Sequence, residues 1–139
     1  MKLSEKYPNT PVFQYFNANP KKRITTDCVE RAVCTGLDIP YNQVVMEMAE
    51  THCQTGYDPG SNEGINLYLK TKGWVKHNQP KKENGKKYTG KEFCKNIAEP
   101  GKRYIANIGG NHIVAIVNCK VYDIWDSTDC CIGIYWAKE

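Results

Sequence analysis

The 139-residue sequence has no apolar run long enough to cross a bilayer, and this absence argues against a transmembrane protein. Its longest apolar runs, Ile113 to Val117 and Ile132 to Trp136, have the length of strands. The first residues carry charge, but no apolar segment follows them as it would in a secretory signal. We therefore expect a soluble, cytoplasmic protein that does not bind membranes.

The seven cysteines include no Cys-x-x-Cys pair, and this absence argues against a structural zinc site. An odd number of cysteines without a secretory signal also indicates free thiols rather than a disulfide framework. The sequence contains neither a phosphate-binding glycine loop nor the strand-to-helix elbow of a serine hydrolase. We expect no metal and no cofactor.

Arginine is scarce, although the formal net charge is +4. The segment from Lys70 to Arg103 holds eleven of the nineteen basic residues, and no RNA- or DNA-binding motif accompanies them. A solvated, lysine-rich surface is therefore favoured over a nucleic-acid interface. A nucleic-acid accessory protein is the least favoured function that we consider.

The length predicts one domain, residues 1–139, and excludes TIM barrels, two-domain dehydrogenases and kinases, which need far more chain. Hydrophobic periodicity and capping residues predict helices that begin near Asp27, Tyr41, Ser61 and Thr89. Short runs rich in β-branched and aromatic residues predict strands at 12–16, 74–77, 104–108, 112–117, 121–126 and 132–136. This order predicts an α+β domain in which an N-terminal helical half packs on a C-terminal antiparallel β-sheet.

Cys28 stands in the first turn of the predicted helix that follows Asp27. Asp27 and Glu30 have the spacing of a capping box, which fixes the start of that helix. The positive end of the helix dipole and the free backbone N–H groups both favour a thiolate at this position. The same N–H groups can receive the oxyanion that forms when a thiolate attacks a carbonyl. Cys28 is therefore our candidate nucleophile.

His112 opens a predicted strand directly after two glycines and Asn111, so its ring can face a cleft. The next strand offers two carboxylates, Asp123 and Asp126, that could orient the ring. A two-residue turn would place Asp123 diagonally on the same side of the hairpin as His112. A three-residue turn, or a bulge, would place Asp126 directly opposite His112. The sequence leaves both registers open.

These residues resemble the papain-like cysteine peptidase superfamily, in which a cysteine starts a helix and a histidine opens a strand much later in the chain. The segments that carry the closer resemblance span nearly the whole chain: Tyr15 to Pro20, Asp27 to Ala32, Asn111 to Val117, Val121 to Ser127, and Tyr135-Trp136. They are similar to small proteins of bacteria and their phages with this fold. If a phage encodes this chain, we expect it in the host cytoplasm.

The resemblance implies that Cys28 is the nucleophile, His112 the general base and Asp126 the orienting carboxylate, with Asp123 as the alternative. Papain-like enzymes place a glutamine about six residues before the cysteine to complete the oxyanion hole, and this chain has Lys22 there. Asn17, Asn19 or Thr25 could substitute for the glutamine, and Asn19 is our choice.

The function that this implies is a papain-like thiol hydrolase that acts on an amide, isopeptide or thioester bond through a Cys-His-Asp triad. A peptidase, a glutamine deamidase and an acyltransferase would all use the same residues. The expected partner is a protein or peptide substrate, including a host protein. The alternative is a catalytically silent binding protein with the papain fold, such as a phage-encoded inhibitor of a host protein. We expect Trp125, Tyr57 and the loop from Asn78 to Tyr88 to form walls of the substrate site.

Overall fold

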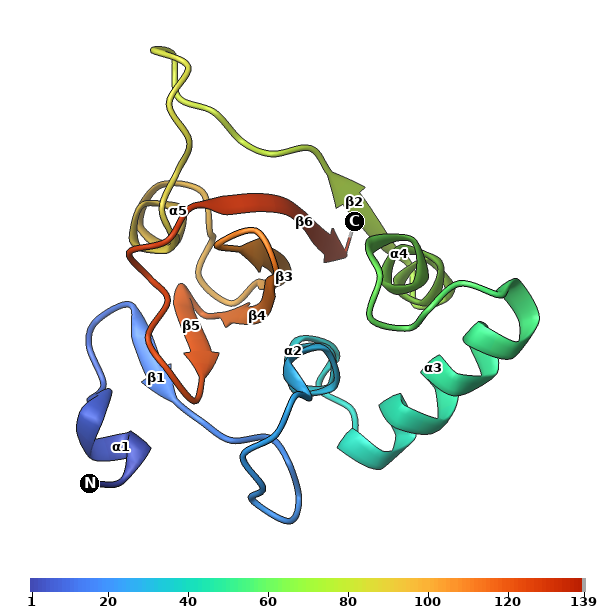
Figure 1. Ribbon diagram of the computed structural model, residues 1–139. Coiled ribbons are helices and arrows are strands. Elements are labelled where there is room, and N and C mark those ends of the chain that lie inside the picture. The colour runs from blue at the N-terminus through green and yellow to red at the C-terminus, as the bar shows by residue number, and fades with distance from the viewer. Residues whose placement is uncertain (139) are drawn as a thin grey trace.

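The computed structural model describes residues 1–138, which form five helices and a six-stranded sheet (Figure 1). The helices are α1 (Leu3–Lys6), α2 (Cys28–Leu37), α3 (Tyr41–Thr55), α4 (Asn62–Thr71) and α5 (Gly90–Asn96). The strands are β1 (Phe13–Tyr15), β2 (Trp74–His77), β3 (Arg103–Ile108), β4 (His112–Val117), β5 (Lys120–Asp123) and β6 (Ile132–Lys138). The α+β class expected from the sequence is thus confirmed. None of the helices within residues 1–138 is long and apolar enough to span a membrane.

The sheet has the strand order β1-β5-β4-β3-β6-β2, and it is mixed rather than antiparallel throughout. Strands β3, β4 and β5 form the expected meander, but β6 pairs with β3 and not with β5. Two strands that precede β3 in the chain complete the edges, β1 parallel to β5 and β2 antiparallel to β6. The expectation of a purely antiparallel, C-terminal sheet was wrong in this respect, because hydrophobic runs predict strands without specifying their neighbours.

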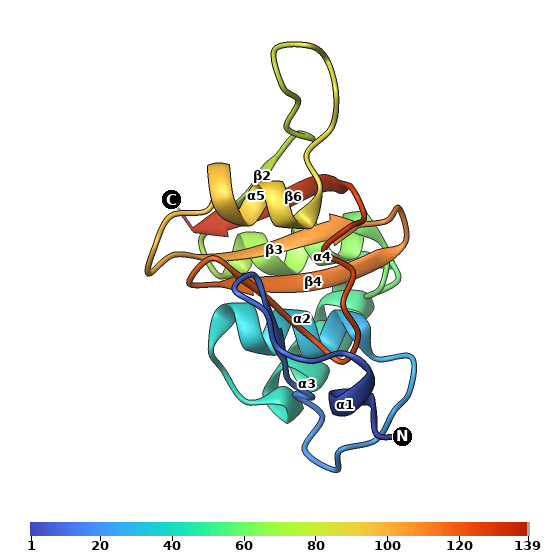
Figure 2. The same cartoon turned by 90° about the vertical axis from the view of Figure 1, so that its left-hand side faces the viewer.

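Helices cover both faces of the sheet (Figures 1 and 2). On one face, α2, α3 and α4 bury a cluster that includes Val33, Val44, Ile65, Ile105 and Trp136. On the other face, α5 and the N-terminal segment bury a second cluster around Phe13, Phe93, Ile108, Ile116 and Ile132. Helix α2 makes its most extensive sheet contact with β4, so the start of α2 lies close to the start of β4.

The start of α4 shows why the sequence has a glycine inside a helix. Ser61 caps α4 by accepting a hydrogen bond from the Gly64 backbone N–H at 3.0 Å, as its position predicts. A Cβ atom at Gly64 would lie 2.1 Å from the Asp58 carbonyl oxygen. The absence of a side chain therefore lets the α3–α4 loop pack against the first turn of α4.

The β4–β5 hairpin resolves the register that the sequence left open. Val117 pairs with Lys120, so the turn consists of Asn118 and Cys119 alone. Both residues have positive φ angles, 50° and 64°, which is the backbone geometry of a type I′ turn. Continued along the hairpin, this register places Trp125 opposite His112 and Asp123 on the His112 side.

Candidate active site

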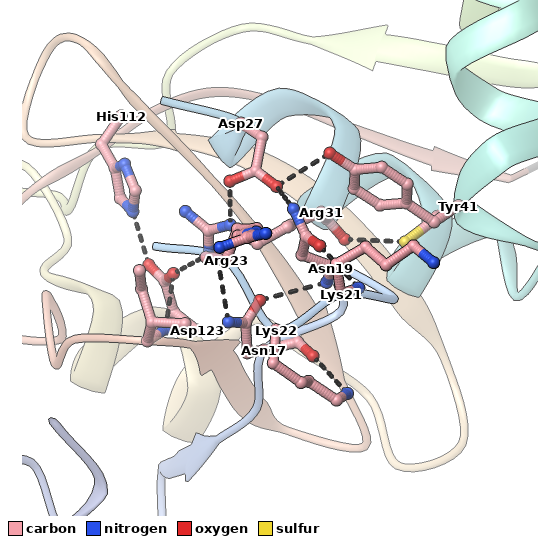
Figure 3. Close-up of polar contacts among 12 residues, drawn as sticks. Asn17, Asn19, Lys21, Lys22, Arg23, Asp27, Arg31, Tyr41, His112 and Asp123 are labelled. Carbon is pink, nitrogen blue, oxygen red and sulfur yellow. Dashed lines mark hydrogen bonds and ion pairs between the residues drawn. The ribbon is translucent and has the colours of Figure 1, made fainter. Parts of the chain in front are cut away.

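Cys28 is the first residue of α2, as the sequence predicted, but the helix is not capped in the predicted way. The Asp27 side chain makes no cap hydrogen bond to α2. Its carboxylate instead accepts hydrogen bonds from Asn19, Arg31 and Tyr41 (Figure 3). The predicted Asp27–Glu30 capping box was therefore wrong. The backbone N–H groups of the first turn of α2 do not donate to the Asp27 carboxylate.

His112 opens β4, and its ring interacts with both Cys28 and Asp123. Its Nε2 atom lies 2.5 Å from the Asp123 Oδ2 atom (Figure 3). His112 and Cys28 also interact, since each shifts the pKa of the other. Because Asp123 occupies Nε2, Nδ1 is the ring nitrogen that remains for the thiol. The His112 ring is thus shared by Cys28 and Asp123.

The carboxylate beside His112 is Asp123 and not Asp126, which corrects the expectation drawn from the resemblance. Asp126 lies beyond the end of β5, where its Oδ1 atom accepts hydrogen bonds from the Thr128 backbone N–H (2.9 Å) and hydroxyl (2.6 Å). The two-residue turn explains the difference, because a third turn residue is needed to bring position 126 opposite His112. Asp126 stabilises a local turn.

Asp123 is itself held by Arg31, a residue that the sequence did not single out. Asp123 is only 2% exposed, and its Oδ1 atom accepts hydrogen bonds from Arg31 Nη1 and from the Ile124 backbone N–H, both at 2.7 Å. Arg31 Nε donates to Asp27 Oδ1 at 2.8 Å, so one buried guanidinium joins two buried carboxylates. In the sequence, this ion pair was indicated by the four-residue spacing of Asp27 and Arg31.

The ionisation of Cys28 and His112 is coupled. Burial raises the pKa of the Cys28 thiol, but His112, the Ile113 backbone N–H and Arg31 together lower it below its ordinary value of 9.0. Burial lowers the pKa of His112, but Asp123 and Cys28 together raise it to about 9. Both shifts favour a thiolate beside an imidazolium at neutral pH.

The other buried cysteines show the opposite behaviour. Burial raises the pKa of the Cys94 thiol to about 12, and burial also raises the pKa of Cys34. All seven cysteines are free. Cys28 is therefore distinguished by its ionic surroundings, which is the property expected of a reactive thiol.

The Asn19 side chain, our choice of oxyanion donor from the sequence, makes hydrogen bonds within the loop before α2. Its side chain is buried (7% exposed), its Nδ2 atom donates to Asp27 Oδ2 at 2.9 Å, and its Oδ1 atom accepts from the Lys21 backbone N–H. Asn17 is similarly occupied, because its Nδ2 atom donates to the Arg23 carbonyl. The Lys22 ammonium donates to the Asn17 carbonyl at 2.9 Å. The two asparagines thus stabilise the loop before α2.

The expected walls of the site are only partly found around His112. The Trp125 ring lies 4.9 Å from the His112 ring, centroid to centroid, so Trp125 covers the imidazole as its register position predicts. The loop from Asn78 to Tyr88 instead projects away from the sheet beyond β2 and α5 (Figures 1 and 2). Tyr57 is half exposed in the loop between α3 and α4.

Comparisons with protein-family models, with curated proteins and with solved structures found no match to this chain. Within residues 1–138, no group of three or more His, Cys, Asp or Glu side chains is arranged to hold a metal ion. The interpretation of the site therefore depends on the geometry around Cys28.

Proposed function

We propose that this protein is a papain-like thiol hydrolase that attacks the carbonyl carbon of an amide, isopeptide or thioester bond with Cys28. The observation that carries the proposal is the contact of His112 with the buried Asp123 carboxylate, together with a Cys28 thiol whose pKa the same ring lowers. A nucleophile, a base and an orienting acid in one site are the parts that covalent acyl transfer needs. The start of a helix packed against a β-hairpin is also where the papain-like fold would hold them.

In the proposed reaction the Cys28 thiolate adds to the carbonyl carbon and forms a tetrahedral oxyanion. The N–H groups at the start of α2, including that of Cys28, are the donors nearest to this charge. The His112 imidazolium then protonates the leaving amine or thiol as the C–N or C–S bond breaks, which leaves an acyl-enzyme.

Water or a second amine resolves the acyl-enzyme. Neutral His112 removes a proton from this nucleophile, and the Cys28 thiolate leaves as the second tetrahedral intermediate collapses. Asp123 holds the ring orientation and stabilises the imidazolium in both halves of the reaction. Hydrolysis, deamidation and acyl transfer differ only in the attacked carbonyl and the resolving nucleophile.

Alkylation of each cysteine by iodoacetamide, followed by peptide mass mapping over a range of pH, tests the proposal. We expect Cys28 to react as a thiolate below its ordinary pKa and faster than Cys119 or Cys130. In His112→Ala the pKa of Cys28 should rise, because burial, the largest effect on this thiol, then acts with less opposition. A Cys28 that reacts no faster than Cys119 and ignores the His112 substitution would refute the hydrolase.

A binding protein without catalysis is the second candidate, and the occupied Asn19 side chain favours it. Without a side-chain donor the oxyanion hole is weaker, and one lost donor costs about 10²-fold to 10³-fold in rate. Activated alkylation of Cys28 without an acyl-enzyme, after incubation with peptide thioesters and intact-mass analysis, would support the binding protein.

A further inference from the structure

A cavity of about 200 Å³ lies at the starts of α2 and β4. Val29 and Ile113, which directly follow Cys28 and His112 in the chain, form one part of its wall. Three asparagines, Asn62, Asn107 and Asn111, supply polar groups elsewhere in its lining. A substrate side chain that enters this cavity would contact the residues that follow Cys28 and His112.

Asn107 is an unusual residue for this position, because it is polar and buried within β3. It pairs across the sheet with Ile113 and lies at the irregularity in the β3–β6 pairing between Ala106 and Ile108. Bulges of this kind often lie next to active sites, where they redirect a side chain. Gly133 on β6 accommodates it, since a Cβ atom there would lie 3.3 Å from the Asn107 Cβ atom.

The Asn107 side chain has one unused hydrogen-bonding atom. Its Nδ2 atom donates to Asn62 Oδ1 at 3.2 Å, and the residue is only 9% exposed. Within residues 1–138 its buried Oδ1 atom has no hydrogen-bond partner. Buried polar atoms are normally paired, so this acceptor calls for a donor that the chain itself does not supply.

The chemistry of the lining selects among possible side chains. No charged residue contributes to the cavity wall, so a lysine or arginine side chain would find no counter-charge. A carboxylate only accepts hydrogen bonds and would leave Asn107 Oδ1 unpaired, as would an apolar side chain. A neutral carboxamide has two N–H donors and an acceptor oxygen, which match the acceptors and donors of the three asparagines.

We propose that this cavity binds a glutamine or asparagine side chain of a peptide substrate, next to the bond that Cys28 attacks. The inference rests on the proposed function of Cys28 and adds a substrate class to it. Asn107 and Asn62 are the residues that determine specificity. These two residues discriminate between substrates, because a site that hydrogen-bonds an amide binds analogues without the amide less well.

Peptidyl fluoromethyl ketones that differ in one side chain test the specificity. Glutamine, glutamate and methionine are placed in turn at the last and at the penultimate residue, and the rate of Cys28 modification is followed by mass spectrometry. At one of these positions we expect glutamine to react about tenfold faster than the other two, or more. Equal rates for the three side chains at both positions would overturn the proposal.

Variants of the cavity separate specificity from reactivity. Asn107→Leu and Asn62→Ala should each remove most of the preference for glutamine, measured within each variant as the ratio of the rates for the glutamine and methionine ketones. Asn42→Ala, an exposed asparagine on α3, is the matched control and should keep the preference. Thermal unfolding identifies any variant that fails to fold, and Asn107→Ala, which removes the amide without adding bulk, then replaces Asn107→Leu. Retention of the preference in folded Asn107 and Asn62 variants would contradict the assignment.

A binding measurement tests the cavity independently of catalysis. In Cys28→Ala protein, NMR titration with acetyl-glutamine amide should shift the side-chain amide signals of Asn62 and Asn107, while acetyl-methionine amide should not. If iodoacetamide reveals no activated Cys28 but this shift occurs, the hydrolase fails and the carboxamide site stands. If Cys28 is activated and no shift or preference is found, the carboxamide site alone fails.

Discussion

The Asp123 carboxylate contacts Nε2 of His112 at 2.5 Å, although Asp123 stands two positions short of the residue directly opposite His112 in the hairpin register. This diagonal contact depends on the two-residue turn at Asn118 and Cys119. It leaves the other ring nitrogen for Cys28 and makes Asp123 the residue that sets the charge of His112. Asp123 therefore determines how reactive Cys28 is.

Asp123→Asn should weaken the activation of Cys28, and Asp126→Asn is its matched control. Without the Asp123 charge the pKa of His112 falls, because burial is then opposed by Cys28 alone. We expect alkylation of Cys28 at neutral pH to slow by about tenfold for each unit by which its thiol pKa rises. The pH profile of iodoacetamide modification measures the effect.

In Asp126→Asn the alkylation of Cys28 should be unchanged, because the Asp126 carboxylate accepts its hydrogen bonds from Thr128 in a local turn. A larger loss of reactivity in Asp126→Asn than in Asp123→Asn would show that Asp126, and not Asp123, orients His112.

Arg31→Met should strongly destabilise the protein. The substitution leaves Asp27 and Asp123 buried without the guanidinium that lies between them. Removing one partner of a buried ion pair typically costs about 3–5 kcal/mol. Urea denaturation of wild type and variant measures the free energy of unfolding, and Arg23→Met, at an exposed residue before α2, is the control. Equal losses in the two variants would argue against a structural role for the buried pair.

The raised pKa of His112 predicts how its contribution to stability depends on pH. The folded protein binds this proton more tightly than the unfolded chain, whose histidine has the ordinary pKa of 6.5. The contribution is therefore complete below pH 6.5 and is lost as the pH rises through about 9. The difference in unfolding free energy between Cys28→Ser and Cys28→Ser/His112→Gln, a background in which no thiol titrates beside the ring, should shrink with increasing pH across this range. A difference that grows over the same range would contradict the shift.

Gly64→Ala should destabilise the protein even though alanine is the better helix former by about 1 kcal/mol. The new Cβ atom would lie 2.1 Å from the Asp58 backbone oxygen, so the α3–α4 loop must move. Such overpacking typically costs about 1–3 kcal/mol. Thermal unfolding measures the net effect, and a higher melting temperature for the variant would show that the loop yields without cost.

Local patterns in the sequence predicted much of the fold. The Ser61 cap of α4, the Thr89 cap of α5 and the strand that His112 opens all depend on neighbouring residues, and all are present. The neighbours of β6 and of the two strands that precede β3 depend on contacts between distant segments, which hydrophobic runs do not specify.

In the candidate site, too, local sequence patterns predicted some features and not others. The positions of Cys28 and His112 at the start of their elements followed from local signals. The identity of the carboxylate depended on whether the turn holds two residues or three, a choice made by the positive φ angles of Asn118 and Cys119. The pairing of Arg31 with Asp123 spans 92 positions and has no local signal.

Titration of Cys28 and His112 by NMR tests the central claim most directly. Protein labelled with ¹³C at the cysteine Cβ atoms and in the histidine rings reports both ionisations in one experiment, with Cys28→Ser and His112→Gln to assign the signals. We predict that Cys28 loses its proton below its ordinary pKa of 9.0 and that His112 keeps its proton up to about pH 9. A Cys28 pKa at or above 9.0 together with a His112 pKa near 6.5 would contradict the ion pair and the hydrolase built on it.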